Sequence, residues 1–147
     1  MVDTGKELRK AYFSLLSGQV TVEGSAIPFV DEKLEVNINE HDTYVMFTSQ
    51  DEEDVSNKKH FANETLIRLQ IVNQRKATNT KEVVESVSNQ ILSKLFPTRT
   101  SWAVSLSSPL SLTYAKYLNG SYNPVEMTDN GFVISKILTI KNRIVQN

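Results

Sequence analysis

The chain has 147 residues, a mass of 16.6 kDa, a formal net charge of -1 and no cysteine. This length is typical of one domain, so we expect residues 1–147 to form a single folding unit. The absence of cysteine excludes disulfides, thiolate zinc sites, iron–sulfur clusters and cysteine nucleophiles. The two histidines, His41 and His60, are too few for a multi-histidine metal centre.

The hydropathy pattern predicts neither membrane insertion nor secretion. The longest apolar runs, such as residues 44–47, are far shorter than the ~20 residues that span a bilayer. The N-terminal region lacks a basic start followed by an apolar stretch, so we expect no secretory signal peptide. The near-neutral net charge disfavours a protein that wraps nucleic acid through bulk positive charge.

Acidic and basic residues are unevenly distributed along the chain. Residues 31–64 carry ten acidic and three basic side chains, whereas residues 65–147 carry four acidic and ten basic ones. One interpretation is a well-solvated surface with uneven loops. The other is head-to-tail association of identical copies, in which the negative surface of one copy meets the positive surface of the next.

Apolar residues at helical spacing predict a short amphipathic helix over residues 5–17. Gly18 follows it as a C-terminal stop signal. Residues 20–22 and 27–30 then predict a small hairpin, whose second strand Pro28 keeps at a sheet edge. The β-branched and aromatic residues that follow predict a strand over 44–48.

Four consecutive acidic residues lie in the polar stretch 49–59. They are Asp51, Glu52, Glu53 and Asp54. Adjacent carboxylates repel one another and stay solvated, so we interpret residues 49–59 as a loop. A calcium site is disfavoured there, because an EF-hand loop alternates its ligands around a central glycine and this run does not.

Alternating hydrophobicity predicts a half-buried strand over residues 65–73, followed by a polar turn at 76–80. The most regular pattern in the chain then predicts an amphipathic helix over 80–96, which Pro97 ends. We expect one face of this helix to form the core against the sheet. The expected core residues are Val84, Val87, Ile91 and Leu95 on the helix and Leu69, Ile71, Leu138 and Ile140 on strands.

Two further strands are predicted over residues 110–118 and 132–145, with turn signals at 119–120 and 130–131. The last strand has apolar residues on one face and polar residues on the other. Its apolar residues are Ile134, Leu138, Ile140 and Ile144, and its polar residues are Ser135, Thr139, Lys141 and Arg143. The order of elements predicts an α+β fold, with an antiparallel sheet of about four main strands, two helices packed on one face and a small N-terminal hairpin.

The sequence contains no recognisable catalytic constellation. His41 and Asp42 form a lone pair, without the further ligands that a metal-dependent phosphohydrolase requires. Neither a Gly-x-Ser-x-Gly elbow nor a phosphate-binding Gly-x-x-x-x-Gly-Lys-Ser/Thr loop occurs. We therefore expect no enzymatic activity, no metal site and no cofactor.

A second interpretation is based on basic and aromatic residues of the last two strands. The basic residues are Lys116, Lys136, Lys141 and Arg143, and the aromatic residues are Tyr114, Tyr117 and Tyr122. Such residues on one sheet surface could hold a single-stranded nucleic acid. The alternative function is thus a small single-stranded nucleic-acid-binding module, or an enzyme whose site is cryptic.

The order of features along nearly the whole chain resembles the tail-completion or tail-terminator family of tailed bacteriophages. These features are a helix at 8–16, a Val-x-Val-x-Gly segment leading to Ile-Pro-Phe-Val over 20–30, an acidic stretch, a strand at 44–47, a Ser-Asn-Lys-Lys-x-Phe loop at 56–61, an alternating strand at 66–72, a helix at 83–95 and a closing strand at 137–145. The segment 98–108 has no counterpart in this pattern.

The resemblance implies a structural virion protein that forms a ring, commonly hexameric, in the neck or tail. Its partners would be further copies of itself and the neighbouring connector and tail proteins, and genome DNA would pass through the ring without specific binding. It would act in the virion after assembly in the host cytoplasm.

Within such a ring, the acidic run 51–54 has two possible positions. It could line the channel, where carboxylates repel the phosphates of passing DNA. It could instead dock on a basic surface of the neighbouring copy, bearing Lys136, Lys141 or Arg143. We favour docking, because the remainder of the chain is so positively biased.

Overall fold

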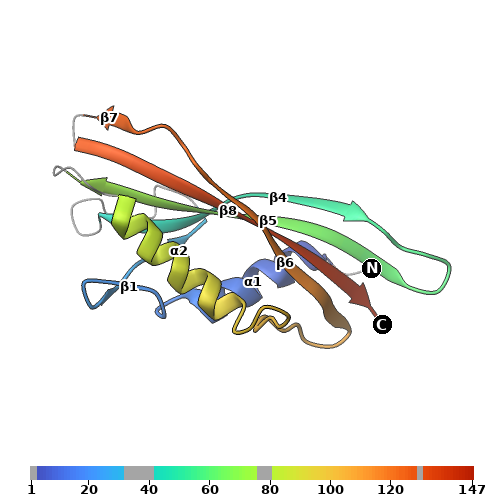
Figure 1. Cartoon of the computed structure of the whole chain (residues 1–147). Coiled ribbons are helices and arrows are strands. Elements are labelled where there is room, and N and C mark those ends of the chain that lie inside the picture. The colour runs from blue at the N-terminus through green and yellow to red at the C-terminus, as the bar shows by residue number, and fades with distance from the viewer. Residues whose placement is uncertain (1–2, 32–41, 76–80, 129–130) are drawn as a thin grey trace.

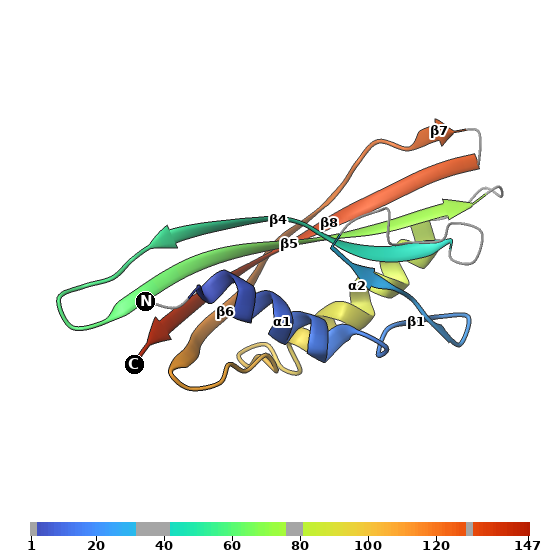
Figure 2. The same cartoon turned by 180° about the vertical axis from the view of Figure 1, so that it is seen from behind.

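The computed structural model describes residues 3–31, 42–75, 81–128 and 131–147. In chain order, the elements in these ranges are α1 (Thr4–Leu16), β1 (Thr21–Val22), β2 (Ser25–Ala26), β3 (Phe29–Val30), β4 (Thr43–Asp54), β5 (Phe61–Arg75), α2 (Lys81–Leu95), β6 (Leu110–Tyr122), β7 (Glu126–Thr128) and β8 (Gly131–Gln146). Figures 1 and 2 show a long twisted sheet with both helices on the same side of it.

The main sheet has six strands in the order β3-β4-β5-β8-β6, with β7 also paired to β8. The long strands β4, β5, β8 and β6 are antiparallel to their neighbours in this order, whereas β3 runs parallel to β4. The α+β class with a mostly antiparallel sheet is confirmed, but the expected number of about four strands is too low. The two additional strands, β3 and β7, have only two and three residues, too few for an alternating pattern to be visible in the sequence.

The N-terminus of α1 is capped by a side chain. Oδ1 of Asp3 accepts hydrogen bonds from the backbone N–H groups of Gly5 and Lys6, at 3.0 and 3.3 Å. These bonds satisfy two of the amides that a helix start leaves without a partner in the helix. The predicted helix over 5–17 is confirmed as Thr4–Leu16.

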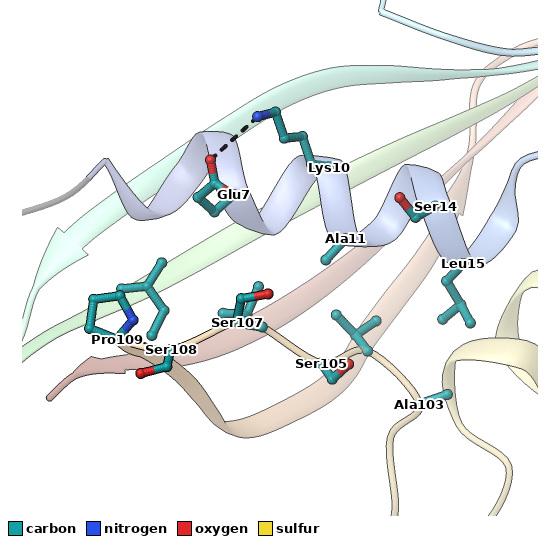
Figure 3. A pocket seen from close by; sticks show the side chains of 13 residues that line it. Glu7, Lys10, Ala11, Ser14, Leu15, Ala103, Ser105, Ser107, Ser108 and Pro109 are labelled. Atoms are coloured by element: carbon teal, nitrogen blue, oxygen red, sulfur yellow. Dashed lines mark hydrogen bonds and ion pairs between the residues drawn. The ribbon is translucent and has the colours of Figure 1, made fainter.

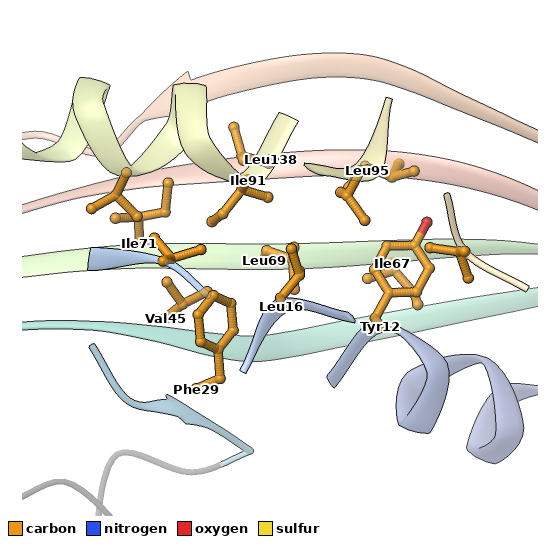
Figure 4. Close-up of a cluster of buried hydrophobic side chains, with 14 of the residues drawn as sticks. Tyr12, Leu16, Phe29, Val45, Ile67, Leu69, Ile71, Ile91, Leu95 and Leu138 are labelled. Atoms are coloured by element: carbon orange, nitrogen blue, oxygen red, sulfur yellow. The ribbon is translucent and has the colours of Figure 1, made fainter. Parts of the chain in front are cut away.

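The core lies between the two helices and the sheet (Figure 4). α2 contributes Val84, Val87, Ile91 and Leu95, and α1 contributes Leu8, Tyr12 and Leu16. The facing strand residues are Leu69, Ile71, Leu138 and Ile140. All of these side chains are at most 1% exposed, so the predicted core is confirmed.

The small N-terminal hairpin is present, but its second strand is not the predicted one. β1 pairs with Ser25–Ala26 through a turn in which Glu23 and Gly24 have φ angles of 52° and 81°. Two positive φ angles are typical of the tight two-residue turn that joins antiparallel strands. Phe29–Val30 instead joins the main sheet as its edge strand, and the Pro28 carbonyl accepts a hydrogen bond of 2.9 Å from the amide of Val45.

The prediction of a loop over 49–59 is wrong for its acidic part. β4 continues to Asp54, which pairs with Asn63 of β5. Successive side chains of a strand point to opposite faces, so the four carboxylates are divided between the two sides of the sheet. This separation reduces the repulsion on which the loop prediction rested, and residues 55–60 alone connect β4 to β5.

The turn predicted at 119–120 is also wrong, because both residues lie within β6. A Cβ on Gly120 would displace the ends of two side chains, because it would collide with the Tyr117 hydroxyl and lie 2.8 Å from Cε of Lys136. Of the second turn signal, Asn130 lies outside the described residues, and Gly131 begins β8 with a φ of 113°. The apolar face predicted for the last strand is confirmed, since Ile134, Leu138, Ile140 and Ile144 are buried.

Candidate interface on the open face of the sheet

The side of the sheet turned away from α1 and α2 is called the open face here (Figure 2). Near the start of β4, it carries a small apolar cluster formed by Val30, Tyr44 and Val72. Burial raises the pKa of Tyr44 above its usual value. Toward the β4–β5 turn the open face is charged. The residues predicted to form the interface are divided between this face and the helix side of the sheet.

A β-bulge decides which carboxylates of β4 reach the open face. Phe47 pairs with Leu69 and Gln50 pairs with Ile67, so β4 has one extra residue between these pairs. Beyond the bulge, Asp51 and Glu53 therefore lie on the open face. The four acidic residues do not form one common patch.

Glu52 and Asp54 lie on the helix side of β4. A Cβ on Gly5 would collide with the Glu52 carboxylate, so this carboxylate lies against the first turn of α1. Negative charge is favourable beside a helix N-terminus. Asp54 accepts a hydrogen bond of 2.8 Å from the amide of Ser56, and its hydrogen bonds with Ser56 lower the pKa of its carboxyl. Both residues thus have local structural partners.

Strand register arranges the charged residues of the open face in two rows. One row runs Asp51, Leu66, Lys141, Lys116 across β4, β5, β8 and β6. The next runs Glu53, Glu64, Arg143, Tyr114 across the same strands. In both rows the acidic residues lie toward the β4 edge, and the basic residues, Lys141, Lys116 and Arg143, lie on β8 and β6 toward the other edge. The open face is therefore electrostatically polarised across its width.

Two ion pairs neutralise part of this charge. Nη1 of Arg68 lies 2.6 Å from Oδ2 of Asp51, and Nζ of Lys141 lies 2.9 Å from Oε2 of Glu64. The Glu64 carboxylate raises the pKa of Lys141 by hydrogen bonding and by charge. Within the described ranges, Glu53 at one edge and Lys116 and Arg143 toward the other have no ion pair.

The third basic residue expected at the interface, Lys136, lies on the opposite side of the sheet from Lys141 and Arg143. Its Nζ lies 5.1 Å from the centre of the Tyr122 ring, a cation–π contact that Lys81 also makes at 4.9 Å. Lys136 therefore does not share a surface with Lys141 and Arg143. Side chains on one face of a strand differ in residue number by an even amount, and Lys136 and Lys141 differ by five.

The aromatic residues of the nucleic-acid interpretation are divided in the same way. Tyr114 lies on the open face and is 40% exposed, whereas Tyr117 and Tyr122 pack against the core on the helix side. Only one of the three rings thus shares a surface with Lys141 and Arg143. On that surface the carboxylates of Asp51, Glu53 and Glu64 would repel phosphates.

A second feature is a cavity of about 540 Å³ between α1 and the segment 103–110 (Figure 3). Most of this segment belongs to residues 98–108, which have no counterpart in the sequence resemblance, and Val104 packs into the core. The charged residues of the cavity wall, Glu7 and Lys10, are paired with each other at 3.5 Å. Serines dominate the remaining polar wall, and none of the described lining residues is a histidine that could activate a serine.

His41 lies outside the described residues. His60 is exposed in the β4–β5 turn, and its backbone N–H donates a hydrogen bond of 3.0 Å to Asn57. Among the described residues, no three His, Asp or Glu side chains are grouped so that they could hold a metal ion. None of the described helices is long and apolar enough to cross a membrane.

The ion-pair partners of the predicted interface residues could not be identified from the sequence. The alternating pattern of β5 places Arg68 and Glu64 on its polar face. Only the pairing register shows that they form ion pairs with Asp51 and Lys141. Lys116 belonged to the nucleic-acid interpretation and not to the predicted interface. Its position at the free edge of β6 follows from the strand order, which the sequence pattern does not determine.

Comparison with known proteins gives a likeness of fold. No protein-family model matches the chain, and no curated protein matches it in sequence. Its structure is similar to that of a chain in the virion of a native gene transfer agent particle, with a TM-score of 0.63 and 11% sequence identity. The similarity covers 97% of this chain and 94% of the other. The chain thus shares its overall fold with a component of a virion particle.

Proposed function

We propose that this chain is a structural protein of a phage-like virion, whose copies assemble into a ring in the neck or tail. The observation that carries the proposal is the likeness of its fold to a chain of the gene transfer agent virion. Because that likeness covers 97% of one chain and 94% of the other, it relates two whole folds and not a shared fragment. The order of sequence features that resembles tail-completion proteins supports the same role.

The distribution of charge supports assembly as the function, in preference to catalysis. The charged residues of the open face lie in rows along a sheet, where a flat partner surface can reach them, and not around a cavity. The acidic β4 edge and the basic β6 edge are complementary to each other. A protein with such edges can bind further copies of itself in head-to-tail order.

In this proposal the chain is not an enzyme and needs no cofactor. Its partners are its own copies, in a ring of six or more as in tail-completion proteins, and the adjoining connector, neck and tail proteins. Genome DNA passes through the ring without specific binding. The protein is located in the virion and is assembled in the host cytoplasm.

The test is the assembly state of the purified full-length protein. Light scattering at micromolar concentration and negative-stain electron microscopy should reveal closed rings of uniform size. A titration with single-stranded DNA should give no salt-sensitive binding. A monomer at every concentration would overturn the proposal, and tight salt-sensitive binding of single strands by that monomer would favour the nucleic-acid-binding alternative.

A further inference from the structure

The main sheet has two free edges within the described residues. β3 covers β4 only at Val45 and Met46, so residues 47–54 have no strand on their outer side there. β6 ends the strand order on the other side. Edge strands have unpaired backbone N–H and C=O groups, which can pair with another chain.

Strand direction allows the two edges to pair between copies in the same orientation. β4, β5, β8 and β6 alternate in direction, so β4 and β6 run antiparallel to one another across one sheet. If a second copy is placed beside the first without turning it over, its β4 lies antiparallel to the β6 of the first. The sheet then continues from copy to copy with both open faces on the same side.

Strand register brings two regular segments of equal length to the same level of the sheet. In β4, pairing is regular after the bulge that ends at Gln50. In β6, bulges after Leu112 and after Tyr117 leave residues 114–117 regular. The register aligns these four residues with residues 50–53 of β4 in antiparallel order. Each edge thus has a straight segment of matching length at the level of its counterpart.

The side chains of the two segments are also complementary. Extending the rows into the next copy places Lys116 opposite Asp51 on the open face, with Glu53 at the diagonal position. Opposite charges on facing strand positions attract. Two of the large apolar side chains that are exposed, Tyr114 at 40% and Leu118 at 42%, also lie on the β6 edge, where a neighbouring strand would cover them.

Charge complementarity also argues against the other orientations. Two β4 edges would bring Asp51 and Glu53 of both copies together, and two β6 edges would bring the basic residues together. Like charges on facing strands repel. The edges therefore favour a head-to-tail contact between β4 and β6, which is the type of contact from which rings are built.

We infer that copies of this chain join by antiparallel pairing of residues 114–117 of β6 with residues 50–53 of β4 in the next copy, with Lys116 opposite Asp51. This inference rests on the proposed function and names the surface through which the ring forms. The interface combines backbone hydrogen bonds between the edges with charge pairs on the open face. In this interface Lys116 is the basic residue directly opposite the acidic strand of the next copy, whereas Lys141 and Arg143 lie one strand further away on β8.

Cysteine cross-linking tests the inference directly, because the native chain has no cysteine. Asp51→Cys combined with Lys116→Cys places two thiols opposite each other at every contact, within the distance that a disulfide spans. Oxidation should convert the variant into a ladder of covalent oligomers on a non-reducing gel. Each single variant should remain uncross-linked, since one thiol alone has no partner in a head-to-tail contact.

The matched control combines Glu52→Cys with Lys116→Cys. Residue 52 is a neighbour of Asp51 on the same strand but points to the helix side, so this pair should not cross-link. Cross-linking of the Asp51→Cys single variant would overturn the inference, because it requires two β4 edges to meet. Equal cross-linking of the control pair would overturn it as well.

A second measurement makes the test independent of thiol chemistry. Lys116→Glu should shift the protein from assembled toward monomeric in light scattering, and adding Asp51→Lys to it should restore assembly. If the native protein forms rings but neither cross-linking nor charge reversal has an effect, the edge pairing is wrong and the proposed function stands. If the native protein forms no oligomer at any concentration, both are wrong.

Discussion

The phenol of Tyr12 in α1 donates a hydrogen bond of 2.6 Å to Oδ1 of Asn142 in β8. Both residues are fully buried, and 130 positions separate them in the chain. The Asn142 amide in turn donates to the carbonyl oxygens of Thr65 and Ile140, each at 3.3 Å. This connected set fixes α1 over the sheet beneath the charged rows of the open face, because a buried polar group without a partner is costly.

Replacing Tyr12 with Phe should lower the free energy of unfolding by about 1–3 kcal/mol, because it leaves the buried amide oxygen of Asn142 without a donor. Urea unfolding followed by circular dichroism would measure the change. Tyr114→Phe, on the exposed open face, is the control and should change stability by less than ~0.5 kcal/mol. Equal effects of the two substitutions would show that the buried hydrogen bond contributes nothing specific.

Stability should fall as the pH rises above 10, and Tyr12 should account for part of that fall. Burial raises the pKa of Tyr12 above its usual value of 10.0. Below that value the phenol is protonated in both states; above it the unfolded chain loses the proton and the folded chain keeps it, so the free energy of unfolding decreases. Urea titrations across this range should give a smaller decrease for Tyr12→Phe. An identical decrease in both proteins would contradict the prediction.

Ile91→Ala should destabilise the fold by about 2–5 kcal/mol, because it opens a cavity where α2 packs on the sheet. Phe13→Ala is a suitable control, since the Phe13 side chain is 43% exposed on α1. Thermal unfolding of both variants would measure the difference. A loss below ~0.5 kcal/mol for Ile91→Ala would remove this residue from the core.

The acidic strand should act in assembly through its open-face residues only. Asp51→Asn with Glu53→Gln should weaken oligomerisation at low salt, and raised salt should weaken the native assembly in the same way, since exposed charge pairs are screened. Glu52→Gln with Asp54→Asn removes equal charge from the helix side and should leave assembly unchanged.

Sedimentation at two salt concentrations would measure both of these double variants. If the carboxylates instead line the channel, assembly should be unaffected by either variant, and DNA should adhere more strongly to the ring. That result would replace docking with the channel interpretation of residues 51–54.

Those parts of the fold in which apolar residues recur regularly over many positions were predictable from the sequence. The helix expected over 80–96 and the apolar face of the last strand are present, because their repeats persist over several turns or strand positions. The acidic strand was not predictable, because repulsion between its carboxylates favours a loop as long as its pairing partner is unknown. Residues 63–66 of β5 pair with residues 51–54, and this tertiary pairing outweighs local preference.

Apart from the separation of Lys136 from Lys141, the arrangement of the candidate interface could not be predicted, because it depends on register. Lys136 and Lys141 share a strand but lie on opposite faces, and counting along the strand would have separated them. The meeting of Asp51 with Arg68 depends on the bulge in β4 and on the order of strands. Neither has a signature in a single sequence.

The bulge between Phe47 and Gln50 makes this part of the strand tolerant of changes in length. A homologue lacking Thr48 or Ser49 would have a straight strand, yet the counterparts of Asp51 and Glu53 would still point outward, because the bulge contains one extra residue. Deletion of one residue between Gln50 and Asp54 would instead move every later carboxylate of the strand to the opposite face of the sheet. Insertions and deletions among homologues should therefore be found at the bulge and be absent from the four residues after it.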